Sequence, residues 1–215
     1  MLATPGLADL ASRYSISGHF GDSDYYGAID FKPSGQVYHS VNISGDDKTP
    51  GLAVEYENFL ALAQIDSNGS GNLAIYHRQG DAWVGTYTDY DKGLGFEVLF
   101  GRDPPGLPDA GRAKLGKLAG KYRLSGRNPD GSIYAGEAEV TFYGATFDVD
   151  RTAGKEGMTG TAVAFDGAFV LNVSNSDGRA PIGVLGLFIP DGNGFLGVWA
   201  KAGTDRLGAE RWVRE

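Results

Sequence analysis

Residues 83–97 read WVGTYTDYDKGLGFE, and residues 195–210 read FLGVWAKAGTDRLGAE, which is the same pattern with one residue inserted. Each stretch begins with aromatic-x-Gly-x-aromatic and ends with Gly-x-Glu. Self-similarity at a long, fixed period indicates that a chain is built from copies of one structural unit. The two stretches therefore predict an internal duplication, with one of them near the end of each copy.

The similarity extends through the whole chain. Tyr122 lies 108 residues after Tyr14, and Glu210 lies 113 residues after Glu97. The slow growth of this offset indicates a few single-residue insertions in the second copy. Further pairs on the same drift are Leu10 and Leu118, Gly18 and Gly126, Tyr25 and Tyr134, Gly27 and Gly136, Gly51 and Gly160, and Phe59 and Phe169.

A Pro- and Gly-rich stretch at 104–117 interrupts the repeated pattern. Such composition is typical of a linker between folding units. We therefore expect a first repeat over 1–103, a linker over 104–117 and a second repeat over 118–215. Each repeat is long enough to bury a modest core of its own.

The composition predicts short strands and tight turns. The 34 glycines, 9 prolines and 12% aromatic residues favour all-β structure over helices. Alternating apolar residues between turn signals indicate strands in both repeats. The expected strands lie near 13–18, 25–31, 36–43, 52–57, 59–65, 72–78, 83–89 and 94–100, and near 121–126, 133–142, 145–151, 161–166, 168–174, 182–189, 195–201 and 207–214.

About eight short strands joined by tight turns remove their sheet edges by closing into a barrel. We therefore predict two antiparallel meander β-barrels in tandem. This arrangement resembles that of avidins, lipocalins and other calycin-like barrels. The resemblance concerns the fold alone, because the ligand-binding residues of those families are not recognisable here. The alternative architecture is a single larger barrel or sandwich that takes one half from each repeat.

Charge and cysteine content exclude several classes of partner. A formal net charge of −8, with Lys and Arg scattered, disfavours nucleic acids and anionic membranes. The absence of cysteine excludes disulfides, thiolate catalysis and Cys-based metal sites. The N-terminal residues carry no leader pattern. We expect a soluble protein, cytoplasmic or exported in a mature form, that needs no cofactor and is compatible with oligomerisation.

Two patterns that suggest metal sites are incomplete. Residues 66–71 match the opening of a calcium loop, but its twelfth position is His77 where calcium loops carry a bidentate Glu. The three histidines, His19, His39 and His77, show no short ligand spacing. We therefore expect a plain hairpin turn and no bound metal.

Several residues are candidates for a ligand site in the first repeat. His77 takes the place of Ile189 on an apolar face, and Glu97 recurs as Glu210. Either side chain could also be held structurally, by backbone groups for His77 or by an Arg for Glu97. Tyr14, Trp83 and Tyr87 belong to glycine-flanked aromatic patterns, in which a glycine leaves room for a ring of the core or of a ligand.

The fifth strand of each repeat suggests which barrel is hollow. Phe59, Ala61 and Ala63 align with the bulkier set Phe169, Leu171 and Val173. Because interiors are close-packed, missing side-chain volume leaves room for a ligand. We therefore expect the ligand cavity in the first barrel and a filled, structural second barrel. The expected lining residues are Tyr14, Phe59, His77, Trp83, Tyr87 and Glu97.

Three functions fit these features. The first is binding of a small apolar or aromatic molecule in the first barrel. The second is a cofactor-independent enzyme, such as an isomerase, cyclase or hydrolase, with His77 or Glu97 as acid or base. The third is a carbohydrate-binding or adhesion module that uses exposed aromatic and Asx-rich loops. An internal cavity favours the first two functions over the third.

Overall fold

The computed structural model describes residues 10–65, 71–88, 93–109, 112, 118–175 and 182–215. These residues form sixteen β-strands and no α-helix, so the all-β prediction is confirmed. The strands of the first repeat are β1 (Arg13–Phe20), β2 (Ser23–Ser34), β3 (Val37–Ser44), β4 (Asp47–Tyr56), β5 (Phe59–Ile65), β6 (Gly71–Gln79), β7 (Ala82–Thr88) and β8 (Leu94–Phe100). Those of the second are β9 (Gly120–Arg127), β10 (Ile133–Tyr143), β11 (Thr146–Ala153), β12 (Glu156–Phe165), β13 (Ala168–Asn175), β14 (Val184–Asp191), β15 (Gly194–Lys201) and β16 (Gly208–Arg214).

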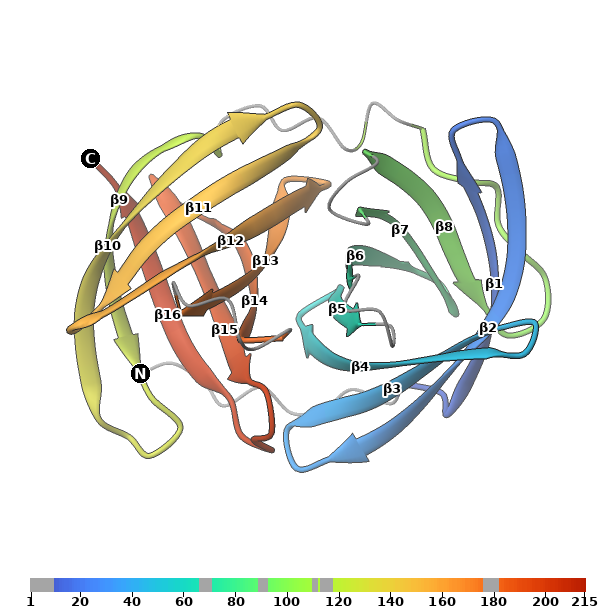
Figure 1. Ribbon diagram of the computed structural model, residues 1–215, viewed down its shortest axis with the longest axis horizontal. Helices are drawn as coiled ribbons and strands as arrows, with labels where there is room; N and C mark the ends of the chain where they lie inside the picture. The colour runs from blue at the N-terminus through green and yellow to red at the C-terminus, as the bar shows by residue number, and fades with distance from the viewer. Residues whose placement is uncertain (1–9, 66–70, 89–92, 110–111, 113–117, 176–181) are drawn as a thin grey trace.

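Each repeat closes into its own antiparallel barrel. In the first barrel, consecutive strands pair along the chain and β8 returns to pair with β1, where Glu97 faces Gly18. In the second, β16 pairs with β9, where Glu210 faces Gly126. The two barrels lie side by side in Figure 1. The predicted tandem barrels are therefore confirmed, and the alternative of one shared barrel is wrong.

The strand registers give a one-to-one residue correspondence between the barrels. Asn42 on β3 faces Ile29 on β2, and Arg151 on β11 faces Ala138 on β10 in the equivalent ladder. On the fifth strand of each barrel, Leu62 faces Ala53 and Leu171 faces Ala162. Leu171 thus corresponds to Leu62, and the expected alignment of Leu171 with Ala61 is wrong by one residue.

Each barrel has an apolar interior of its own. In the first barrel, the interior cluster contains Tyr14, Ile16, Ile29, Phe31, Tyr38, Ala53, Leu60, Leu62, Ala74, Tyr76, Trp83 and Leu99. In the second, it contains Leu118, Tyr122, Leu124, Ala138, Val140, Phe147, Val149, Met158, Ala162, Ala164, Phe169, Leu171, Val173, Phe188 and Trp212. Side chains on a strand alternate between faces, so a residue next to one of these points out of its barrel.

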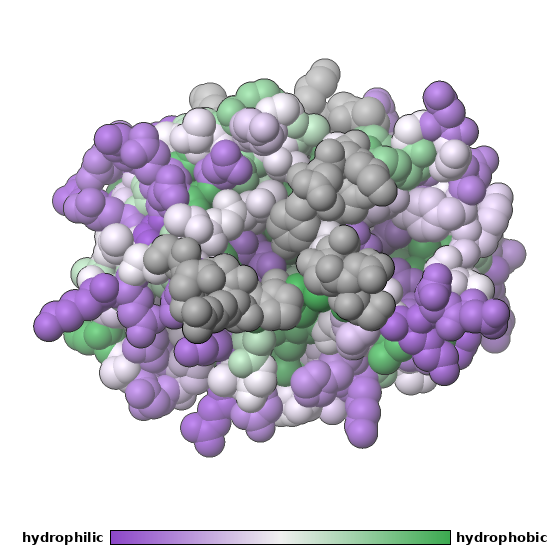
Figure 2. Space-filling model, in the orientation of Figure 1, coloured by the Kyte–Doolittle hydropathy of each residue, from purple (hydrophilic) through white to green (hydrophobic). Residues whose placement is uncertain are grey.

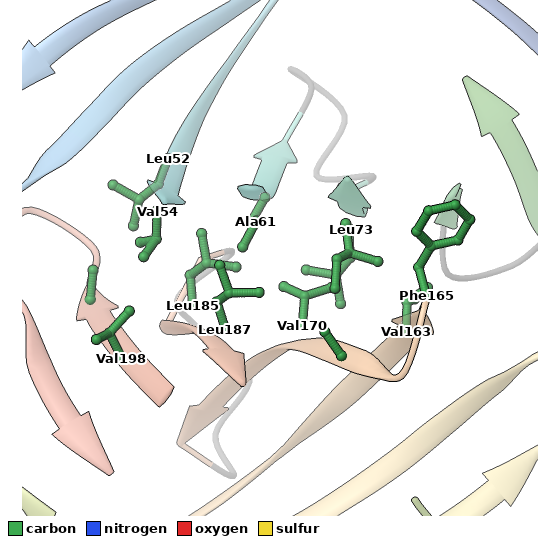
Figure 3. Packing of buried hydrophobic residues seen from close by; sticks show 14 of the residues in the cluster. Leu52, Val54, Ala61, Leu73, Val163, Phe165, Val170, Leu185, Leu187 and Val198 are labelled. Atoms are coloured by element: carbon green, nitrogen blue, oxygen red, sulfur yellow. The ribbon is translucent and has the colours of Figure 1, made fainter. Parts of the chain in front are cut away.

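A third apolar cluster lies between the barrels. Strands β4 to β7 of the first barrel contact β12 to β15 of the second. Figure 3 shows Val54, Ala61 and Leu73 on one side of this contact and Val170 and Leu185 on the other. Burial of this apolar surface stabilises the side-by-side arrangement of the barrels. It also explains why β5 and β14 are buried on both faces.

The positions expected to line a cavity on the fifth strand belong to this contact. Ala61 and Ala63 are part of the cluster between the barrels, and Phe59 packs against it. A shift of one residue moves every side chain of a strand to the opposite face. Because the sequence alignment of the fifth strands was wrong by one residue, it assigned Phe59, Ala61 and Ala63 to the barrel interior. The small alanines pack toward the second barrel and therefore add no space to the interior of the first.

His77 also lies at the contact between the barrels. Its ring stacks on Phe59 with centroids 4.5 Å apart, and its Nδ1 lies 2.8 Å from Oδ2 of Asp166 in the second barrel. Arg112, between the two barrels in sequence, donates from Nε to Oδ1 of Asp166 at 2.9 Å. Burial opposes ionisation of Asp166, but the hydrogen bonds from Arg112 and His77 outweigh it and lower the pKa of this carboxyl.

The face of the molecule drawn in Figure 2 is largely polar along its periphery. Hydrophilic side chains surround both barrels in this view. Among the described residues, no helix is long and apolar enough to cross a membrane. The same residues contain no group of three or more side chains suited to hold a metal ion. The predicted hairpin turn at 66–70 lies outside the described residues.

Candidate functional site at the equivalent ends of the two barrels

The two barrels carry pockets at equivalent ends. The pocket of the first barrel has a volume of about 260 Å³, and that of the second about 700 Å³. Eight lining positions correspond through the strand registers, namely Tyr25 and Tyr134, Asn42 and Arg151, Ser44 and Ala153, Asp47 and Glu156, Thr49 and Met158, Gln64 and Val173, Asn72 and Val184, and Tyr87 and Trp199. The expectation of the larger cavity in the first barrel, with a filled second barrel, is therefore wrong.

Arg151 reaches the second pocket because it continues an inward-facing row of β11. Phe147, Val149 and Arg151 alternate along the strand and are all buried, with Arg151 only 4% exposed. Its Nη2 donates to Oε2 of Glu210 at 2.6 Å. Glu210 enters from β16 and is fully buried, so this is an ion pair inside the barrel.

Glu210 accepts two further hydrogen bonds. The Tyr134 hydroxyl donates to Oε2 at 2.5 Å, and Trp212 Nε1 donates to Oε1 at 2.6 Å. The pKa of Tyr134 is raised by burial and by the adjacent carboxylate. Gly126 leaves space for this tyrosine, because a Cβ there would lie 2.2 Å from the ring. These hydrogen bonds offset part of the cost of removing the ion pair from water.

Two donors of Arg151 and one of Trp199 remain without an acceptor. The Nε and Nη1 atoms of Arg151 and Nε1 of Trp199 are buried and have no hydrogen-bond partner among the described residues. Both side chains line the second pocket. Lys155 and Lys201 add positive charge to its lining, against one acid, Glu156. The pocket is thus locally positive in a chain with a net charge of −8.

The remaining wall of the second pocket is mostly apolar. Met158, Val173 and Val184 replace three polar residues of the first barrel. The Trp199 and Tyr134 rings lie 6.3 Å apart in an edge-to-face arrangement. Apolar walls with a few convergent polar groups are typical of small-molecule sites.

The equivalent carboxyl of the first barrel, Glu97, has different partners. Tyr25 donates to its Oε2 at 2.5 Å, and the Tyr76 hydroxyl donates to its Oε1. Among the described residues, no cationic side chain pairs with Glu97. Burial raises its pKa, although the two tyrosine hydrogen bonds act in the opposite direction. Burial and the neighbouring Glu97 also raise the pKa of both tyrosines.

Amide side chains replace the cation in this first pocket. Asn42, at the position of Arg151, donates from Nδ2 to Oε1 of Gln64 at 3.4 Å. Gln64 is 2% exposed, and its Nε2 has no acceptor among the described residues. Asp47 is the second acid in the lining, and the described lining residues include no Lys, Arg or His. This pocket is therefore polar and carries only negative groups.

The residues expected to form one site are divided among three places. Tyr87 and Glu97 line the first pocket. Tyr14 and Trp83 belong to the interior cluster, where Trp83 Nε1 donates to the Tyr14 hydroxyl at 3.3 Å. Phe59 and His77 lie at the contact between the barrels, outside the first barrel. The structure thus does not place His77 in the same cavity as Glu97.

The sequence prediction missed the tyrosine and the arginine that contact the two glutamates. Tyr25 and Tyr134 are part of the repeated pattern, so their recurrence was an available signal. Arg151 follows Phe147 and Val149 at alternate positions, which predicts an inward-facing cation. Its acceptor, Glu210, lies 59 residues away, and no local pattern joins the two.

Comparison of the chain with protein-family models, with curated proteins and with solved structures gave no match. No residue role is therefore transferred from a relative. The functional assignment depends on the geometry of the two pockets.

Proposed function

We propose that this protein binds a small molecule with an apolar or aromatic body and an anionic group, in the end pocket of the second barrel. The observation that carries the proposal is Arg151, which lines this pocket and has two buried donor nitrogens without an acceptor among the described residues. Buried donors in folded proteins almost always have acceptors, and each one left without an acceptor costs about 1–3 kcal/mol. A ligand carboxylate or similar anion supplies those acceptors.

The local charge supports an anionic ligand. Glu210 neutralises the positive charge of Arg151, and Glu156 offsets the charge of one of the two pocket lysines. One positive charge thus remains in the immediate surroundings. A guanidinium with two unpartnered donor nitrogens suits a planar, oxygen-rich anion.

The size and wall of the pocket support an apolar body. Its volume of about 700 Å³ falls within the range of roughly 300–1,000 Å³ that is usual for ligand pockets. Met158, Val173 and Val184 offer aliphatic contacts, and Trp199 offers a ring with a free N–H. These groups favour an aromatic or aliphatic ligand over a sugar.

A pair of fluorescent probes tests the proposal. 1-Anilinonaphthalene-8-sulfonate carries an anion on an aromatic body, and 1-anilinonaphthalene has the same body without the anion. We expect saturable binding of both, with the sulfonate about ten- to a hundredfold tighter, as the loss of a charge-assisted hydrogen bond implies. The double variant Arg151→Met with Glu210→Gln removes both charges together and should abolish this preference.

Variants that fill space locate the binding. Val184→Trp should abolish binding of both probes, because it occupies the second pocket. Asn72→Trp, at the corresponding position of the first barrel, is the matched control and should leave binding intact. Circular dichroism and unfolding curves verify that each variant is folded. Retained probe binding in folded Val184→Trp, or an anion preference that survives the double variant, would contradict the proposal.

A further inference from the structure

We propose that the end pocket of the first barrel is a second binding site, specific for a small organic cation with a guanidinium or ammonium group. The cation would lie against Glu97, where the second barrel places the guanidinium of its own Arg151. This site is separate from the proposed anion site of the second barrel and does not depend on it.

The second barrel shows how a cation is held at this position. The Oε2 atom of Glu210 accepts both the Tyr134 hydroxyl at 2.5 Å and Arg151 Nη2 at 2.6 Å. In the first barrel, Oε2 of Glu97 accepts the equivalent hydroxyl of Tyr25 at 2.5 Å. The same oxygen thus retains capacity for a second, charged donor, because a carboxylate oxygen has two lone pairs.

Space for the cation arises from one substitution between the repeats. Asn42 occupies the position of Arg151. The pairing with the following strand confirms this correspondence, because Asn42 faces Thr49 and Arg151 faces the equivalent residue Met158. Asparagine is too short to reach across the barrel as arginine does. A pocket of about 260 Å³ lies there, lined by both Asn42 and Glu97. That volume is large enough for a small organic cation.

The surroundings favour a positive charge over a neutral or negative ligand. Glu97 is 6% exposed and has no cationic partner among the described residues. A carboxylate that is shielded from water attracts a cation more strongly than a fully solvated one does. Asp47 adds a second negative group to the lining.

Aromatic rings further favour a cation. Tyr25, Tyr76 and Tyr87 all line the pocket, and the rings of Tyr25 and Tyr87 lie 5.9 Å apart at right angles. The faces of tyrosine rings attract guanidinium and ammonium groups. The free Nε2 of Gln64 additionally offers a donor to an oxygen of the ligand.

Calorimetric titration with methylguanidinium and with methylurea tests the proposal. The two probes have nearly the same shape, but only methylguanidinium is charged. We expect saturable 1:1 binding of methylguanidinium, and binding of methylurea at least tenfold weaker. Glu97→Gln keeps the shape of the side chain and removes its charge, so it should weaken methylguanidinium binding at least tenfold. Equal binding of both probes, or no binding of either, would overturn the proposal.

A transplanted arginine provides a second, independent test. Asn42→Arg should place the guanidinium of the chain itself on Glu97, as Arg151 does on Glu210, and so abolish methylguanidinium binding and raise the melting temperature. Val184→Trp, which fills the pocket of the second barrel, is the control and should leave methylguanidinium binding unchanged. Unchanged binding in folded Asn42→Arg would contradict the inference. If Asn42→Arg does not fold, the Glu97→Gln titration decides by itself.

Discussion

Glu97 and Glu210 occupy the same position in two barrels of the same topology, yet they have different chemical environments. Glu210 forms an ion pair with Arg151 and accepts donors from Tyr134 and Trp212. Glu97 accepts hydroxyls from Tyr25 and Tyr76 and has no cation among the described residues. The common partner is the tyrosine of the second strand, Tyr25 or Tyr134.

Three differences between the repeats account for this contrast, and one is that Leu99 stands on the eighth strand where Trp212 donates to Glu210. Tyr76 corresponds to Phe188 on the sixth strands, and Asn42 corresponds to Arg151 on the third. The barrel that lacks the second hydroxyl has Arg151 and Trp212 as donors, and the barrel that lacks both of these has the Tyr76 hydroxyl. A buried carboxyl needs donors, and the two barrels supply them in different ways. The duplicated scaffold thus provides one locally positive and one negative pocket.

The largest expected effect on the free energy of unfolding comes from neutralising Glu210, and the same change at Glu97 is the comparison. Glu210→Gln leaves Arg151 buried without its counter-ion and should lower the free energy of unfolding by about 3–5 kcal/mol. Glu97→Gln removes a carboxyl that has no cationic partner, so it should cost less than about 1 kcal/mol or stabilise the protein at neutral pH. Urea unfolding, followed by tryptophan fluorescence, compares the two variants. Equal losses would show that the environments do not differ as described.

A smaller effect is expected when the second barrel is given the donors of the first. Arg151→Asn should destabilise the protein because Glu210 then loses its cation. Adding Phe188→Tyr should restore about 1.5 kcal/mol or more, since its hydroxyl can donate to Glu210 as Tyr76 does to Glu97. Phe188→Tyr alone should bring no gain because Arg151 is still present. If the effects of Arg151→Asn and Phe188→Tyr were strictly additive, the introduced hydroxyl would not compensate for the lost arginine, contrary to this prediction.

The smallest expected effect is on the pH dependence of stability. Burial raises the pKa of Glu97, so the folded state holds this proton more tightly than the unfolded state does. The stability linked to Glu97 is therefore fully present below its unfolded pKa and is lost as pH rises through the raised folded value. The difference in unfolding free energy between the wild type and Glu97→Gln should thus fall as pH rises from about 4 to 8.

Asp166 provides a control of opposite sign for that measurement. Its pKa is lowered, so its contribution is present above the unfolded pKa and is lost as pH falls through the lowered folded value. Asp166→Asn should therefore give a difference that shrinks toward acid pH. A flat difference for Glu97→Gln would show that this carboxyl titrates in the folded protein as it does in the unfolded chain.

The sequence by itself determined the duplication, the antiparallel strands and their closure into two barrels. These features depend on glycine spacing, turn residues and period-2 alternation, which are local and are written twice in the chain. The recurrence of Glu97 as Glu210 likewise indicates a position that matters in both repeats. It does not indicate the partners, because Arg151 and Glu210 lie on distant strands and meet only when the barrel has closed.

Only the tertiary structure decided which face of the central strands is inside. Residues 59–65 are apolar on both faces, since one face meets the barrel interior and the other meets the second barrel. Alternation cannot distinguish two buried faces, so Ala61 and His77 were expected inside and lie outside. The relative sizes of the pockets also arise from tertiary packing. They depend on how side chains from several strands fill one space, which no single strand encodes.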